Sequence, residues 1–383
     1  MTRSNSITVI PVFYVPDEPV TWAGAGRRPN EIAMTFGSGR LQFFDTFLNP
    51  VSPRSPVLRA DTSFNGAAFD EGLIVLGARD EVLVYMGVDG KPGEFTIGSG
   101  CHGVVGGVSG KVVAPMGDGG LLCIQKQENG NYRRSVVKVE GAEPYFYRTV
   151  CLGKDEAGYD LFASACRSDG LVLTPIGPHH ALGEISFLEA KRDLEDAPDI
   201  VSLCPLKLPD YPRALALLAM DGSIYFSSDP RSGEFVAMAS DRLQGTPYSI
   251  HSAQGHLFIL TSDKMYALRN LGRNVIRDEP IAIESNTVSF EVDAVDSTLI
   301  DDEYLLIVRE ELVTLNRVSE MFGPSQVIAS NYHSRQDSTE ARFTESMFQP
   351  RRRRSFESFS EFEAVERVFG GESDSVATML EIG

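Results

Sequence analysis

The stretch RALALLAMDGSIYFSSDPRSGEFVAMAS at residues 213–240, followed by YSIHSAQGHLFILTSDKMYAL at residues 248–268, decides the fold of this chain. Each part holds an apolar strand, a tight acidic turn and a second apolar strand: residues 214–220 and 223–227 in the first, 257–260 and 265–268 in the second. Short apolar strands joined by a turn rich in Asp and Gly are typical of a β-hairpin. We therefore expect repeated hairpins.

The same unit occurs seven times along the chain. The copies begin near residues 31, 72, 111, 159, 213, 256 and 303, at steps of 41, 39, 48, 54, 43 and 47 residues. Periods of about 40 to 50 residues are typical of propeller blades, which are small sheets that bury their faces against their neighbours. The sequence predicts an all-β fold, a seven-bladed β-propeller over residues 1–325, with a C-terminal tail at residues 326–383.

The turns inside the copies share a chemistry that suits a hairpin. They read Asp80-Glu81, Asp118-Gly119, Asp169-Gly170, Asp221-Gly222, Asp263-Lys264 and Glu310-Glu311, and the first copy has Gly37-Ser38-Gly39. Gly adopts positive φ freely, and Asp tolerates it. We interpret these aspartates as turn formers, not as catalytic groups.

Weakly apolar stretches between the copies are predicted to form the innermost strand of the following blade. These are residues 103–108, 145–150, 200–204 and 288–292, with residues 7–15 in that role for the first blade. Pro11 lacks a backbone N–H and favours an edge position or a bulge, and not a central position, for the N-terminal strand. We interpret residues 16–30, which contain Trp22, as an irregular connection, and residues 187–200 as a solvated helix stopped by Pro198.

The repeats resemble those of bacterial β-propellers over residues 7–320. The stretch Tyr225-Phe-Ser-Ser-Asp-Pro-Arg-Ser-Gly-Glu-Phe resembles the Asp-box hairpin of sialidase-like propellers, although Phe235 stands where that pattern has tryptophan. Gly106-Gly107 is similar to the kelch doublet. The chain departs from WD40 proteins because no copy has a Trp-Asp dipeptide and Trp22 is the one tryptophan.

Composition narrows the class of partner and the compartment. The 35 Lys and Arg against 53 Asp and Glu give a formal charge of -18, which disfavours nucleic acid and anionic membranes as partners of the body. The five cysteines are an odd number without a C-x-x-C pair, which favours a reducing compartment. Without a secretory signal or an apolar run of about 18 residues, the sequence predicts a cytoplasmic protein with no membrane contact.

Residues of catalytic or ligating types occur without a recognisable pattern. His102, His179 and His180 lack the paired spacing of a zinc site. No nucleophile elbow surrounds Ser227 or Ser228, although Asp229 and His251 follow. A sialidase-like site would need residues such as Tyr147, Arg148, Arg213 and Glu234, to which we assign no roles. The sequence thus predicts no catalytic residue, no metal, no cofactor and no enzymatic activity.

Two segments are candidates for contacting a protein partner. The Pro- and Ser-rich residues 50–64 are expected to form a surface loop, with partner contact as the alternative. The tail is predicted to form an amphipathic helix at about residues 355–369, and its partner-binding candidates are Arg351, Arg352, Arg353, Arg354, Phe356, Phe359, Phe362 and Phe369. Three alternatives are open for the tail. The apolar stripe of the helix docks on a partner, or it folds back on the acidic propeller, or residues 375–382 supply the strand that closes the ring. We favour docking within the chain, since exposed Phe side chains need cover.

The sequence therefore favours a non-enzymatic protein-interaction scaffold, or a regulatory subunit, of a multi-protein bacterial assembly. The inference rests on analogy of fold and on the missing catalytic pattern. The alternatives are a glycan-acting enzyme of the sialidase-like propeller class and a regulatory subunit whose tail is released by modification near Ser355.

Overall fold

The computed structural model of the protein describes residues 12–321, with gaps, and residues 348–350. The gaps of four residues or more are 53–56, 87–92, 97–102, 128–131, 139–145, 179–182, 191–199, 239–242, 269–287 and 290–293. The described part is all-β, with seven antiparallel sheets and the short helices η2 (Pro230–Ser232) and α2 (Val318–Met321). No helix in these ranges is long and apolar enough to cross a membrane.

The sheets follow one another in chain order, and we number them one to seven. Sheet one contains β2 (Val20–Ala25), β3 (Ile32–Phe36) and β4 (Leu41–Phe44). Sheet two contains β5 (Phe64–Asp70), β6 (Leu73–Ala78), β7 (Glu81–Met86) and β8 (Gly93–Thr96). Sheet three contains β9 (Val105–Gly106), β10 (Lys111–Met116), β11 (Gly120–Lys126) and β12 (Tyr132–Lys138). Sheet four contains β13 (Phe146–Lys154), β14 (Asp160–Cys166), β15 (Gly170–Ile176), β16 (Ser186–Ala190) and β28 (Phe348–Pro350). Sheet five contains β17 (Ile200–Pro205), β18 (Leu215–Ala219), β19 (Ile224–Ser227) and β20 (Val236–Met238). Sheet six contains β21 (Pro247–Ala253), β22 (His256–Thr261), β23 (Lys264–Leu268) and β24 (Val288–Ser289). Sheet seven contains β25 (Ala294–Ile300), β26 (Tyr304–Arg309), β27 (Val313–Arg317) and β1 (Val12–Tyr14).

The seven predicted hairpins are confirmed as the second and third strands of the seven sheets, from β3–β4 to β26–β27. The turn between β18 and β19 has the predicted chemistry. Gly222 has a φ of 86°, and the Asp221 carboxylate accepts a hydrogen bond from the Ser223 backbone N–H at 2.8 Å. Three predicted inner strands are confirmed by β9, β13 and β17, which are the first strands of their sheets.

The prediction for the N-terminal segment was wrong. Strand β1 is not the innermost strand of sheet one: it pairs with β27 on the outer edge of sheet seven, with Val12 opposite Leu315 and Tyr14 opposite Val313. The innermost position of sheet one belongs to β2, in the segment interpreted as an irregular connection. The edge position predicted for the N-terminal strand is confirmed.

Two further predictions need correction. Strand β24 lies at the outer edge of sheet six, so residues 288–289 do not begin sheet seven, whose first strand is β25. The predicted helix at residues 187–200 is replaced over Ser186–Ala190 by β16, which pairs with β15 and thereby satisfies its backbone groups. Within the predicted tail, residues 348–350 form β28, which adds a fifth strand to sheet four beside β16.

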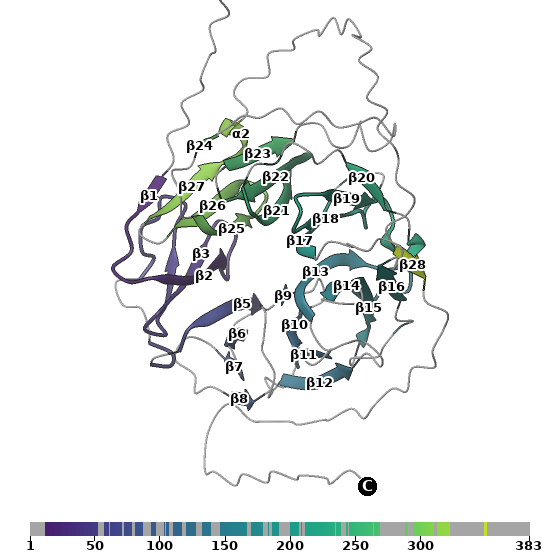
Figure 1. Cartoon of the computed structure of the whole chain (residues 1–383). Coiled ribbons are helices and arrows are strands. Elements are labelled where there is room, and N and C mark those ends of the chain that lie inside the picture. Colours follow the sequence, from purple (N-terminus) through teal and green to yellow (C-terminus); the bar gives the residue numbers. More distant parts are fainter. Residues whose placement is uncertain are drawn as a thin grey trace, which may run out of the picture.

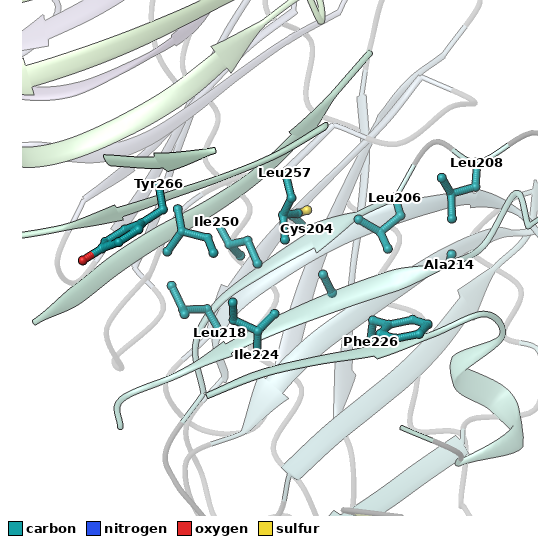
Figure 2. Packing of buried hydrophobic residues seen from close by; sticks show 12 residues of the cluster. Cys204, Leu206, Leu208, Ala214, Leu218, Ile224, Phe226, Ile250, Leu257 and Tyr266 are labelled. Carbon is teal, nitrogen blue, oxygen red and sulfur yellow. The ribbon is translucent and has the colours of Figure 1, made fainter. Parts of the chain in front are cut away.

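The apolar core lies between neighbouring sheets. Figure 1 shows the sheets around a common centre, and each first strand contacts the first strand of the next sheet. Figure 2 shows one cluster, in which Cys204 and Phe226 of sheet five pack with Ile250 and Leu257 of sheet six. Another cluster joins sheet one to sheet seven. Each sheet therefore buries its faces against its neighbours, as the repeat pattern requires.

One buried ion pair crosses between two sheets. Lys111 Nζ at the start of β10 lies 3.4 Å from Asp160 Oδ2 at the start of β14, and both residues are fully buried. A buried charge is costly without a partner, so this contact fixes sheet three against sheet four.

Candidate functional site

The first strands share an irregularity at the same place. In six of the seven sheets, the pairing between the first and second strands shifts register after the first paired residue. Such a β-bulge re-aims the side chain that follows it. The first residues paired after the bulge are Trp22, Gly66, Arg148, Ser202, Ser249 and Asp296, and we call these six positions the bulge layer.

In sheets four to seven the bulge layer is polar, and hydrogen bonds connect three of these sheets. The Ile250 backbone N–H donates to Ser202 Oγ at 3.3 Å, which joins sheet six to sheet five. Ser249 Oγ and Ser297 Oγ lie 2.6 Å apart, which joins sheet six to sheet seven. The polar residues of neighbouring first strands therefore hold one another in place.

His251 and Asp296 flank the buried Ser297. His251 Nε2 lies 2.9 Å from Ser297 Oγ, and Asp296 Oδ1 accepts a hydrogen bond from the Ser297 backbone N–H at 2.8 Å. Burial lowers the pKa of His251 to about 4 and raises the pKa of Asp296, in both cases because it disfavours the charged form. The imidazole is therefore neutral at pH 7.

Arg148 carries the positive charge of the bulge layer. Its guanidinium contributes to the lowering of the pKa of His251 and opposes the rise in the pKa of Asp296. Arg148 is exposed and forms no ion pair with the residues that the structure describes. It lies near the start of β13, whereas Glu156 follows the other end of that strand.

Arg213, the other arginine considered for a sialidase-like site, belongs to a separate network. Its guanidinium lies 3.0 Å from Glu156 and 3.7 Å from Asp229, and Arg231 lies 3.3 Å from Asp155. These ion pairs connect the β13–β14 turn of sheet four to sheet five. The structure thus does not bring Arg213 together with Arg148.

The Asp-box-like stretch has a structural role in the described part. Asp229 is the N-cap of η2, where its carboxylate accepts a hydrogen bond from the Arg231 backbone N–H at 3.1 Å. Gly233 ends η2 with a φ of 73°, and Phe235 packs in the core between sheets four and five. His251 contacts Ser297 and not Ser227 or Ser228, so His251 is not placed to act as a base for these two serines.

A second candidate surface lies on sheet one. The turn at residues 45–49 follows β4 and carries Phe47, whose side chain is 70% exposed. Asp45 Oδ1 accepts hydrogen bonds from the backbone N–H groups of Phe47 and Asn49, at 2.8 and 2.9 Å. Leu48 has a φ of 57° and is buried in the core. A well-anchored turn therefore holds an aromatic ring in solvent.

Several predicted residues lie outside the described residues. These are the partner-binding candidates Arg351, Arg352, Arg353, Arg354, Phe356, Phe359, Phe362 and Phe369, and also His102, His179, His180 and Glu234. Within the described ranges, no three His, Cys, Asp or Glu side chains are grouped to hold a metal ion.

Sequence reasoning missed the bulge layer and Phe47. Ser297 lies 46 residues from His251, about one repeat, so a comparison of equivalent positions in consecutive repeats could have paired them. The signal for Phe47 was an apolar residue in the polar context of Asp45 and Asn49. Comparison with known proteins finds no matching family model and no significantly similar curated protein.

Proposed function

We propose that the seven sheets are the blades of a β-propeller and that the protein is a non-enzymatic interaction scaffold or regulatory subunit. The contact of β25 with β2 and the pairing of β1 with β27 support a ring in which sheet seven meets sheet one. Propellers present side chains and loops on a rigid body, which suits a scaffold. The proposed setting is a multi-protein bacterial assembly.

The Phe47 turn is the observation that carries the scaffold proposal. At 70%, Phe47 has the most exposed aromatic side chain among the described residues, and aromatic anchors dominate binding energy at protein interfaces. The two hydrogen bonds to Asp45 and the buried Leu48 anchor the turn before any partner binds. Little conformational entropy is then lost on association.

The partner we propose is a protein with an apolar pocket surrounded by basic side chains. The pocket would receive Phe47, and the basic side chains would complement a chain whose formal charge is -18. The tail residues Arg351–Arg354 and the predicted helix at residues 355–369 are proposed as a second contact, within the chain or with a partner.

A reducing, cytoplasmic location is part of the proposal. Among the described cysteines, Cys123 and Cys204 are buried free thiols. Burial raises the pKa of Cys123 to about 12 and raises that of Cys204 as well, so both remain protonated and serve as small core side chains.

Site-specific crosslinking tests the scaffold proposal. A photo-crosslinking amino acid is introduced at position 47 in the full chain, in cells that naturally produce it. The matched control carries the same group at position 13, because Phe13 is also exposed, at 58%. We expect one protein to crosslink from position 47 and not from position 13.

The crosslinked protein is then purified and its affinity for the full chain is measured. Phe47→Ser should weaken binding by at least about tenfold, as expected for an aromatic anchor, and Phe13→Ser should leave it unchanged. Identical crosslinks from both positions, or equal affinities of both variants, would contradict the proposal.

A further inference from the structure

Sheet four differs from the other sheets in the described part, because a fifth strand lies on its outer edge. The other six sheets have three or four strands. Strand β28 pairs antiparallel with β16, with Phe348 opposite Ala190 and Pro350 opposite Leu188. Figure 1 shows β28 beside β16, on the side of sheet four away from the common centre of the sheets. The outer edge of β16 therefore accepts an extended segment from outside the seven repeats.

The end of β16 depends on β28 for its pairing. The register between β15 and β16 ends at Leu188, which lies opposite Leu171. Glu189 and Ala190 pair with β28 and, among the described residues, with no other strand. Unpaired edge residues present backbone N–H and C=O groups to any extended segment of a protein. Binding by strand addition needs such an edge, and β28 already uses this one.

Strand β28 is a short occupant held by its connection to the rest of the chain. It has three residues, and Pro350 has no backbone N–H to donate. Residues 322–347 connect it to α2, which follows sheet seven. Such a connection keeps β28 near β16 at an effective concentration on the order of a millimolar. A separate segment displaces β28 if it binds β16 more tightly or is present at a comparable concentration.

The sequence at β28 indicates which segments fit this edge. Strand addition draws affinity from the backbone, and alternate side chains add specificity. Phe348, Gln349 and Pro350 are followed at once by Arg351–Arg354. These basic side chains complement a chain whose formal charge is -18. A matching partner segment is extended, carries an aromatic residue and is followed by basic residues.

We propose that the outer edge of β16 is a docking site for an extended segment of a partner protein, and that β28 blocks this site within the chain. The partner segment has the chemistry of residues 347–354. Because β28 must leave first, the apparent affinity for the partner is reduced by the fraction of molecules in which the edge is unoccupied. The same event frees the residues that follow β28, so partner binding and release of the tail are coupled.

A labelled peptide of residues 345–355 tests the docking site, with fluorescence anisotropy as the readout and the full chain as the receptor. In the β28 variant, Phe348→Pro with Gln349→Pro removes two backbone N–H groups from the blocking strand. This variant should bind the peptide at least about tenfold more tightly than the wild-type protein, because the competitor is gone. The matched control, Ser338→Pro with Thr339→Pro, places the same residues outside β28 and should bind like the wild-type protein.

Two further comparisons locate the contact. A peptide that itself carries Phe348→Pro and Gln349→Pro keeps Arg351–Arg354 and should bind the β28 variant at least about tenfold more weakly than the natural peptide. Ala190→Pro, added to the β28 variant, removes a backbone N–H from the docking edge and should weaken binding by at least about tenfold, whereas Ala190→Ser keeps this group and should not. Circular dichroism and the melting temperature confirm that each variant folds, and Glu189→Pro takes the place of Ala190→Pro if the latter does not.

Four outcomes would overturn the proposal: neither protein binds the peptide, the β28 variant binds it no more tightly than the control, the proline peptide binds as tightly as the natural one, or proline in β16 leaves binding unchanged. The third outcome would show that charge alone attracts the peptide. None of the four bears on Phe47, so this docking site and the Phe47 surface stand or fall separately.

Discussion

His251 shows how burial on a first strand lowers the pKa of a histidine. The ring lies on a first strand, 2.9 Å from the hydroxyl of the buried Ser297, and burial is the main reason that its pKa falls to about 4 from the ordinary 6.5. The folded protein therefore binds a proton at His251 less tightly than the unfolded chain does. The resulting stability is present above pH 6.5 and is lost as the pH falls toward 4.

This difference can be measured with His251→Gln. Urea unfolding of both proteins at pH 7 and pH 4.5 should show that the advantage of the wild-type protein shrinks by about 2 kcal/mol at the lower pH. The raised pKa of Asp296 gives the opposite trend in both proteins, so it cancels in the comparison. A constant difference between the two proteins would contradict the lowered pKa.

The Lys111–Asp160 pair gives a second prediction at the residue scale. Lys111→Met removes the cation 3.4 Å from the buried Asp160 carboxylate, which should lower the free energy of unfolding by about 3 to 5 kcal/mol in chemical denaturation. The double variant Lys111→Met, Asp160→Leu removes both charges and should recover a large part of that loss. A double variant less stable than the single variant would show that the charges do not act as a pair.

At the scale of the element, the turns determine which glycines are essential. Gly39 joins β3 to β4 with a φ of 79°, and a Cβ there would lie 1.7 Å from the Arg59 carbonyl oxygen. Gly255 joins β21 to β22 with a φ of 76°, and a Cβ there would meet nothing within 4 Å. The two positions share the backbone conformation and differ only in the space around it.

Alanine at these two positions separates the cost of positive φ from the cost of a steric clash with neighbouring atoms. Gly255→Ala should cost about 1 kcal/mol, the penalty of positive φ for a residue with a Cβ. Gly39→Ala should cost at least about 2 kcal/mol more, because the chain near Arg59 must move, as overpacking generally requires. Equal losses in thermal unfolding would contradict the close approach of Arg59.

The distance along the chain between paired elements explains which parts of the fold could be predicted from the sequence. Hairpins such as β18–β19 were predictable because the turn at Asp221 and Gly222 and both strands are adjacent in the chain. The contacts beside the bulge layer were not, because residues such as Ser249 and Ser297 are brought together only by the arrangement of whole sheets. Strand β1 was misplaced for the same reason: nothing near Val12 signals that its partner is Leu315.

At the scale of the whole molecule, the pairing of β1 with β27 joins residues near opposite ends of the described chain. The Tyr14 and Phe44 rings are 4.8 Å apart, so β1 also packs against sheet one. It is thus a strand of sheet seven that contacts sheet one. The structure predicts that this strand holds the two sheets together.

A disulfide tests that pairing directly. Phe13 and Thr314 are opposite each other in the register, so Phe13→Cys with Thr314→Cys should form a disulfide under mild oxidation. Peptide mapping identifies the bond against the natural thiols, and Phe13→Cys with Asn316→Cys, out of register, serves as the control. The in-register bond should raise the melting temperature, because it closes a very long loop in the unfolded chain. Equal yields from both pairs would contradict the register.

The position of β1 also affects how the protein is made. As the ribosome synthesises the chain from its N-terminus, Val12 emerges long before its partner Leu315. Until β27 follows, the apolar side chains of β1 and the facing side of sheet one lack their cover. Nascent chains in this state are prone to wrong pairings with other chains. Chaperone demand during synthesis should therefore end late, when the last hairpin is released.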